Sequence, residues 1–205
     1  MTDVVAAFDF DGTIAAHDSL RGFIAGTAGW TGLARSLALS SPQLAGVALG
    51  RADRDEVKEH FLTHALGGRP ATEIARAGRR YGRSLLRAGR FHDAVLARLV
   101  EHREAGDDVV IVSASPEVYL APVAKRLGAG LVASRFAVDD EGRLTGKLAG
   151  GNCRGARKVT RLEEWLGGRE VVLHAYGDSA SDDELLARAD HAYLVNRGKI
   201  SPVSP

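Results

Sequence analysis

Five short apolar segments recur along the chain, at residues 4–8, 109–112, 131–133, 171–176 and 192–195. Within each segment the apolar residues are continuous and do not alternate with polar ones. Alternation is typical of a sheet with one face in water, whereas continuous runs are typical of strands buried on both faces. The pattern therefore predicts a parallel sheet covered by helices on both sides.

Helical patterns lie between these segments. Residues 91–104 carry apolar side chains at helical spacing and are followed by Gly106, and residues 117–127 and 158–166 show the same periodicity. Each of these helices precedes a predicted strand. Strands alternating with helices indicate an α/β fold with a doubly wound, Rossmann-like parallel sheet. In such sheets, ligands bind at the carboxyl ends of the strands.

A long helical insertion interrupts this alternation. Residues 17–89 contain no strand pattern, and a segment of this length is too long to be a simple loop. We therefore expect a core domain made of residues 1–16 and 90–205, with residues 17–89 forming an all-helical cap. The predicted cap helices are 19–26, 33–39, 53–66 and 71–86.

Three other segments have patterns of their own. Residues 135–148 alternate in part around Asp139-Asp140-Glu141-Gly142, which predicts a hairpin. The uncharged stretch 36–50 is too short to cross a bilayer, and we expect a buried helical pair there. Residues 199–205 are expected to form a loose tail.

Composition narrows the class of protein only modestly. Apolar residues make up 45% of the chain, charged residues 26%, and the formal net charge is +1. These values are ordinary for a globular protein and favour neither a nucleic acid nor a membrane as partner. Cys153 is the single cysteine, and the N-terminus has no secretion-signal pattern. We therefore expect a cytoplasmic protein without disulfides.

Carboxylates follow two of the buried strands. Asp9 and Asp11 come directly after the first strand, and two close carboxylates can have well-separated pKa values, so that one attacks while the other holds a proton. Asp178 and Asp182 follow the strand at 171–176, and such a cluster is suited to a hard cation such as Mg²⁺. Each group could instead cap a turn or a helix, with Asp182 or Asp183 beginning a helix at 184–188.

Two further sites could bind an anion. Ser113 ends the strand at 109–112 where a helix begins, and its hydroxyl and the free backbone N–H groups there favour phosphate. Ser115 is expected only to cap that helix. Lys158 lies near the start of another helix, where its charge gains little from the helix dipole, so an anion elsewhere is its expected partner.

In chain order these pieces resemble the four motifs of the haloacid dehalogenase-like hydrolases. The helical insertion resembles the C1-type cap of subfamily IB, in the phosphoserine-phosphatase-like branch. The run Asn152-Cys153-x-Gly155-x-x-Lys158 is similar to one group within that branch. The matching motifs are Asp9-x-Asp11-Gly12-Thr13, Ser113, Gly155-x-x-Lys158 and Gly177-Asp178-Ser179-x-x-Asp182.

The resemblance implies a Mg²⁺-dependent phosphatase acting on a small phosphorylated metabolite. Asp9 would form an aspartyl-phosphate, and Asp11 would serve as acid and then as base. Mg²⁺ would be held by the side chains of Asp9 and Asp178 and the carbonyl of Asp11, while Asp182 braces its waters. The phosphate would be bound by Gly12, Ser113, Ala114 and Lys158.

The substrate stays open at this stage. Phosphoserine phosphatases have a glutamate where this chain has Asp18, which we expect to cap a helix but keep as a possible substrate contact. Phosphoserine phosphatase proper, a lipid-phosphate phosphatase, and a phosphotransferase or phosphomutase with the same intermediate are alternatives. A binding protein on a catalytically silent core is a further one, although the intact motifs argue against it.

The predicted cap is basic. Residues 17–90 contain 12 Lys and Arg against six Asp and Glu. Arg76, Arg80, Arg83 and Arg87 share one helical face, which we expect to be solvated rather than a binding surface. Phe23 and Trp30 are expected to pack in the core of the cap.

Overall fold

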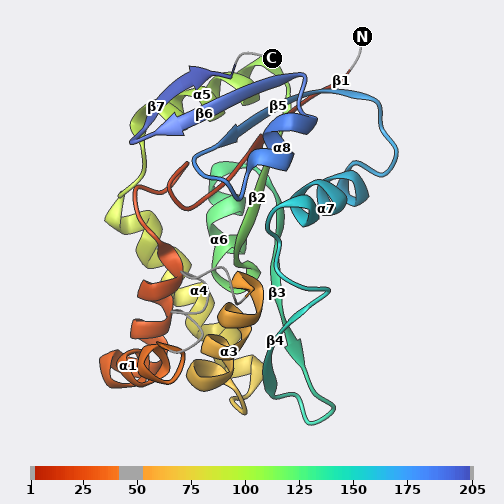
Figure 1. Cartoon of the computed structure of the whole chain (residues 1–205). Helices are drawn as coiled ribbons and strands as arrows, with labels where there is room; N and C mark the ends of the chain where they lie inside the picture. Colours follow the sequence, from red (N-terminus) through yellow and green to blue (C-terminus); the bar gives the residue numbers. More distant parts are fainter. Residues whose placement is uncertain (1–2, 42–52, 204–205) are drawn as a thin grey trace.

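The computed structural model, which describes residues 3–41 and 53–203, is built on a seven-stranded sheet (Figure 1). Its strand order is β4-β3-β2-β1-β5-β6-β7, and only the edge strands β4 and β7 run antiparallel to their neighbours. The predicted doubly wound α/β fold is confirmed. The strands are β1 (Asp3–Phe8), β2 (Asp108–Pro116), β3 (Gly130–Val138), β4 (Leu144–Ala149), β5 (Val171–Gly177), β6 (His191–Asn196) and β7 (Lys199–Pro202).

Helices cover both faces of the parallel strands. Successive residues of a strand point to opposite faces, so Phe8 packs in one apolar cluster with Leu99 and Leu120, and Val5 packs in the other with Leu162. This is why the apolar runs do not alternate. The first face carries α5 (Asp93–Ala105) and α6 (Glu117–Leu127), and the second carries α7 (Ala156–Leu166) and α8 (Asp183–Arg188).

The carboxyl end of β1 is held firmly between its neighbours. The rings of Phe8 and Tyr176 stack with centroids 4.2 Å apart, and the backbone N–H of Asp9 donates to the Tyr176 carbonyl at 2.9 Å. Pairing therefore extends one residue past β1. It places Asp9 where the connections that follow the neighbouring strands β1 and β5 lead to opposite faces of the sheet.

Residues inserted between β1 and β2 form helices that lie beyond the carboxyl ends of the strands (Figure 1). The segments predicted at 19–26 and 33–39 are one helical element, kinked at Gly29, whose φ of 75° and ψ of 166° are not helical. The predicted helical pair at 36–50 lies largely outside the described residues. The described helices are α1 (Ser19–Leu39), α3 (Arg54–Leu66) and α4 (Ala71–Ala88).

Two local predictions were wrong. Residues 199–202 are not a loose tail: they form β7, which pairs with β6 through a turn at Arg197 and Gly198, both with positive φ. Backbone pairing stabilises a strand here although the side chains give little apolar signal. Trp30 does not enter a core, because it follows the kink at Gly29 and is 78% exposed, whereas Phe23 is fully buried.

The predicted hairpin at 135–148 is present but begins earlier. β3 runs without interruption from the expected strand at 131–133 into the first arm of the hairpin, and β4 is the second arm. Gly142 supplies the positive φ of the turn between them. The second arm packs against α3, so the hairpin links the sheet to the inserted helices.

Candidate active site

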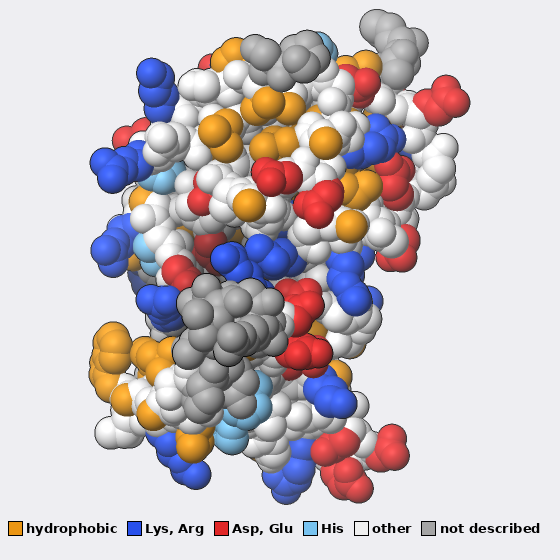
Figure 2. All heavy atoms as spheres, viewed as in Figure 1, with side chains coloured by type: hydrophobic (Ala, Val, Ile, Leu, Met, Phe, Trp, Pro, Cys, Tyr) orange, Lys and Arg blue, Asp and Glu red, His pale blue; other side chains and the backbone are white. Residues whose placement is uncertain are grey.

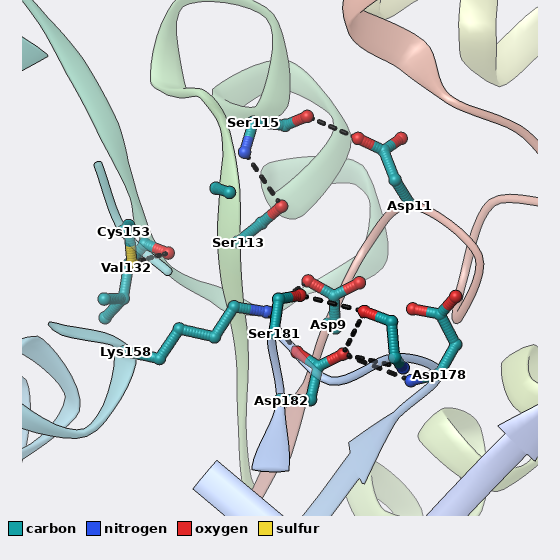
Figure 3. Close-up of polar contacts among 12 residues, drawn as sticks. Asp9, Asp11, Ser113, Ser115, Val132, Cys153, Lys158, Asp178, Ser181 and Asp182 are labelled. Carbon is teal, nitrogen blue, oxygen red and sulfur yellow. Dashed lines mark hydrogen bonds and ion pairs between the residues drawn. The ribbon is translucent and has the colours of Figure 1, made fainter. Parts of the chain in front are cut away.

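Asp9 lies at the centre of a buried acidic cluster at the carboxyl end of the sheet (Figure 3). Carboxylate oxygens of Asp9, Asp178 and Asp182 all lie within 4.8 Å of one another. Asp9 follows β1 and Asp178 follows β5, and these strands are neighbours in the sheet. The fold thus brings Asp9 to two carboxylates that lie 169 and 173 residues farther along the sequence.

The cluster fits a hard divalent cation. Its donors are carboxylate oxygens, which Mg²⁺ prefers, and their crowding without a cation would cost repulsion. Burial, with Asp182 as a further cause, raises the pKa of Asp178. Gly12 leaves the space open, because a Cβ at that position would collide with the Asp178 carboxylate. The side chain of Asp11 is not part of this cluster.

Lys158 supplies the acidic cluster with a positive charge from the chain itself. Its side chain is fully buried and forms ion pairs with Asp9 and with Asp182, the second at 2.5 Å. Burial would lower the pKa of Lys158, but the two carboxylates outweigh it and raise the pKa. The sequence predicted an anionic partner for Lys158, and the structure gives it two, Asp9 and Asp182. For Asp9, burial outweighs the ion pair and raises the pKa to about 7.

Asp182 braces the loop after β5 and does not cap α8 through its side chain. It occupies the N-cap position without a side-chain capping bond. One of its oxygens accepts from Lys158, and the other accepts from the backbone N–H groups of Asp178 and Ser179, both at 3.2 Å. Asp182 thus begins α8, as one of the sequence alternatives has it, but its carboxylate positions Asp178 instead of bonding to the helix end.

Asp11 faces away from the acidic cluster (Figure 3). One carboxylate oxygen accepts from the Ser19 backbone N–H at 2.9 Å, and the other accepts from the Ser115 hydroxyl at 2.5 Å. Burial raises the pKa of Asp11, although these hydrogen bonds partly oppose it. Asp9 and Asp11 therefore have separate partners, although only one residue lies between them.

Ser115 is a site residue that sequence reasoning assigned wrongly. The N-cap position of α6 is Pro116, and Ser115 makes no capping bond. Its hydroxyl is instead oriented by Tyr119, which donates to it at 2.9 Å. The pairing of β2 with β3 is irregular between Ser113 and Pro116, and this irregularity sets the orientation of both serines. Ser113 is buried and accepts from the Ser115 N–H at 3.1 Å.

Comparisons with known proteins agree with this geometry. Residues 6–187 match the family model of the haloacid dehalogenase-like hydrolases. The chain belongs to this family.

Protein CicA of Caulobacter vibrioides is 36% identical over 201 residues, which is 96% of this chain and 88% of that protein. A crystal structure of a protein of unknown function from Bordetella pertussis has a TM-score of 0.75 at 25% identity, covering 91% of this chain and 87% of that one. A phosphoserine phosphatase structure with a phospho-aspartyl intermediate analogue has a TM-score of 0.62 at 19% identity, covering 92% and 84%. The fold and the family predicted from the motifs are confirmed, and the predicted enzyme class, a phosphatase of this family, agrees with them.

A cavity of about 490 Å³ opens beside Asp11 and Asp178 of this haloacid dehalogenase-like hydrolase. Its wall includes Asp11, Gly12 and Asp178 from the turns after β1 and β5, and Ala114 and Ser115 from β2. The inserted helices close the other side. The cavity is lined there by Asp18, Leu20, Arg54, Asp55 and Lys58.

Asp18 caps α1, as the sequence predicts. Its carboxylate accepts from the N–H groups of Leu20 at 2.9 Å and Arg21 at 3.3 Å. Although it lines the cavity, its Oδ1 is thus occupied by the helix end and its Oδ2 lies 3.6 Å from Arg21.

Lys58 and Asn152 are cavity residues that sequence reasoning did not assign to the site. The ammonium of Lys58 donates to the Ala114 carbonyl at 2.6 Å and to Asn152 Oδ1 at 2.7 Å. Asn152 in turn donates to Asp55 at 2.8 Å. Lys58 occupies an ordinary polar position of helix α3, so the sequence pattern gives no indication that it belongs to the site. Asn152 belongs to the motif run before Lys158, which is the signal that could have indicated it.

In the part of the chain that the structure describes, none of the helices is long and apolar enough to cross a membrane.

Proposed function

We propose that the chain is a magnesium-dependent phosphomonoester hydrolase in which Asp9 is the nucleophile and Asp11 the acid and base. The observation that carries the proposal is the division of the two carboxylates. Asp9 faces Lys158 and the acidic cluster, whereas Asp11 faces two hydrogen-bond donors at the cavity. Membership of a hydrolase family supports the same assignment.

In the first step, a carboxylate oxygen of Asp9 attacks phosphorus as the ester P–O bond breaks, and an aspartyl-phosphate forms. The protonated carboxyl of Asp11 transfers its proton to the leaving oxygen. Burial favours this protonated state because it raises the pKa of Asp11. Ser115 and Ser19 fix the position of the carboxyl group.

In the second step, the carboxylate of Asp11 takes a proton from a water molecule. The water oxygen attacks phosphorus, the bond between Asp9 and phosphorus breaks, and inorganic phosphate leaves. Lys158 and the Ser113 hydroxyl, with the backbone N–H of Ala114, would hold the phosphoryl oxygens during both steps. The sequence also predicted the N–H of Gly12 for this role, but in the structure that group donates to the Ala15 carbonyl at 2.7 Å. Lys158 and Ser113 are buried, which strengthens their contacts with a charged group.

Mg²⁺ would be held by the side chains of Asp9 and Asp178 and the carbonyl of Asp11, with Asp182 behind them. When bound, it offsets the negative charge of the phosphate and so allows an ionised Asp9 to approach. The substrate is a small phosphorylated molecule, in keeping with the size of the cavity.

The test is phosphate release from a panel of phosphorylated metabolites with Mg²⁺. We expect Asp9→Asn to lose about a thousandfold or more of kcat, because an amide cannot form the acyl-phosphate. Rapid quenching of the unmodified enzyme should trap phosphate covalently on the peptide that contains Asp9. The matched control is Asp140→Asn in the exposed turn between β3 and β4, which should leave kcat unchanged. Undiminished turnover in Asp9→Asn would refute the proposed mechanism.

A further inference from the structure

Lys58 carries a half-buried positive charge that forms no direct ion pair with any carboxylate among the described residues. Its ammonium group has two hydrogen-bond acceptors, the Ala114 carbonyl and Asn152 Oδ1, and both are neutral. Among the described residues Lys58 takes part in no ion pair. The neighbouring carboxylate of Asp55 is engaged with the amide of Asn152. The direct contacts of this cation are therefore with neutral dipoles, and the carboxylates of Asp55, Asp11 and Asp18 act on it only from farther away.

Such an arrangement is costly without an anionic ligand. Taking an ammonium group out of water is unfavourable unless an opposite charge compensates it. Burial lowers the pKa of Lys58 to about 8, which reflects this cost. A neutral donor would link the same two oxygens at a smaller cost. The positive charge thus indicates a ligand group rather than a purely structural link.

The position of Lys58 indicates which part of a substrate it faces. The carboxylates that most affect it are Asp55, Asp11 and Asp18, of which Asp11 must face the leaving oxygen. The phosphoryl group has its own cation, Lys158, which pairs with Asp9 and Asp182. Lys58 thus lies on the side of the cavity from which the leaving group departs.

Two further cations line the same cavity. The side chains of Arg54 and Arg154 form no ion pair with the residues that the structure describes. On the face drawn in Figure 2, Lys and Arg side chains gather just above the inserted helices. A second negative group on the substrate, in addition to the reacting phosphate, would match this unpaired charge.

We propose that Lys58 determines substrate specificity by binding an anionic group, a carboxylate or a second phosphate, on the leaving group of the phosphomonoester. This inference rests on the proposed phosphatase function and assigns its substrate class. The Ala114 carbonyl and Asn152 orient the ammonium group, and the substrate anion supplies the missing negative charge. Substrates with an uncharged leaving group forgo this contact.

The experiment compares three substrates that share one carbon skeleton: glycerol 3-phosphate, 3-phosphoglycerate and glycerol 1,3-bisphosphate. 3-Phosphoglycerate and glycerol 1,3-bisphosphate carry a second anionic group besides the reacting phosphate. We expect the unmodified enzyme to prefer at least one of these two compounds. Lys58→Met should lower kcat/KM for that compound by about ten- to a hundredfold, mainly through KM, because a charged hydrogen bond is lost. Glycerol 3-phosphate should change by less than about threefold. Comparing 3-phosphoglycerate with glycerol 1,3-bisphosphate shows whether Lys58 binds a carboxylate or a second phosphate.

Three controls separate specificity from folding. Lys58→Arg keeps the charge and should recover part of the preference. Lys147→Met makes the same exchange at an exposed position of β4 and should change nothing. Glycerol 3-phosphate turnover by Lys58→Met reports whether the variant is folded and active.

Two results would overturn this inference and leave the proposed phosphatase function standing. One is turnover of all three compounds by the unmodified enzyme without a preference for an anionic leaving group. The other is an equal loss for all three in Lys58→Met, which would assign Lys58 to the phosphoryl group or to a structural role. The proposed function, and this inference with it, would instead be overturned if the unmodified enzyme released phosphate from none of the three compounds and from none of the wider metabolite panel.

Discussion

Asp9 and Asp11 have different chemical environments because the chain turns sharply between them. Asp9 stays with the sheet, one residue past β1, and its pKa is raised to about 7 by burial against the partial compensation of Lys158. Asp11 leaves the sheet and is bound by Ser19 and Ser115. Two identical side chains can therefore carry opposite roles in the proposed reaction.

A dependence of stability on pH and on Mg²⁺ follows from Asp9. Its pKa is higher in the folded chain than the ordinary value of 3.8, so its contribution to stability is complete below that value and is lost as the pH rises through about 7. In the proposed site Mg²⁺ would bind the ionised carboxylate, and it should then reverse this loss. We expect Mg²⁺ to raise the thermal unfolding midpoint clearly at about pH 8 and little at about pH 5.

Thermal unfolding at both pH values, with and without Mg²⁺, measures this effect. Asp178→Asn removes one oxygen ligand of the cluster and should abolish most of the Mg²⁺ response. An equal Mg²⁺ response at the two pH values would contradict the assignment of Asp9 as a ligand.

At the scale of elements, the contact between α4 and α6 controls how the site is presented. Two glycines of α4 allow the helices to approach closely: a Cβ at Gly78 would lie 2.5 Å from the Val118 carbonyl, and one at Gly82 would lie 2.5 Å from Pro122. Pro122 has no N–H for the Val118 carbonyl four residues earlier. This packing holds Tyr119, whose hydroxyl bonds to Ser115 and so supports Asp11.

We expect Gly82→Ala to lower the free energy of unfolding by about 1–3 kcal/mol, because the added methyl group forces the helices apart. Gly26→Ala is the matched control. Gly26 lies in α1 with nothing within 4 Å of an added Cβ, so the change should stabilise the chain by up to about 1 kcal/mol. Urea unfolding of both variants provides the measurement. Equal effects of the two substitutions would show that helix propensity and not the close approach decides the outcome.

At the scale of the whole molecule, polar contacts join the inserted helices to the sheet both at the cavity and along the β3–β4 hairpin. Asn152 is central to them, because its side chain bonds to Lys58 and Asp55 of α3 and to Ser134 of β3. Farther out, Glu59 of α3 accepts from the Leu148 N–H of β4 at 2.9 Å. We propose that residues 17–89 act as a cap that opens and closes about these contacts during turnover.

Hydrogen exchange measures this opening. In Asn152→Ala we expect the amides of α3 to exchange at least about tenfold faster, with those of β1 and β2 nearly unchanged, since about 1.4 kcal/mol of local stability corresponds to a factor of ten. Asn196→Ala at the exposed end of β6 is the control. A uniform acceleration across helices and sheet would indicate global destabilisation and contradict a separately moving cap.

Much of this fold could be predicted because its elements are encoded locally. The run at 4–8, the helix at 117–127 and the glycine turn at Gly142 depend on apolar spacing and backbone preference, and the structure has all three. The errors occurred where distant partners decide. β7 depends on pairing with β6, and Ser115 depends on Asp11, which is 104 residues away in the sequence.

The sequence by itself determined the family, the parallel sheet and the residues of the acidic cluster, because ordered motifs after buried strands must meet at one sheet edge. Only the tertiary structure decided which way each side chain faces. It separated the Asp11 side chain from the acidic cluster, made Asp182 a brace for Asp178, and placed Lys58 of an inserted helix against the Ala114 carbonyl. The reason is physical: strand and helix formation follow from neighbours along the chain, whereas the burial and pairing of a charge follow from groups that only folding brings together.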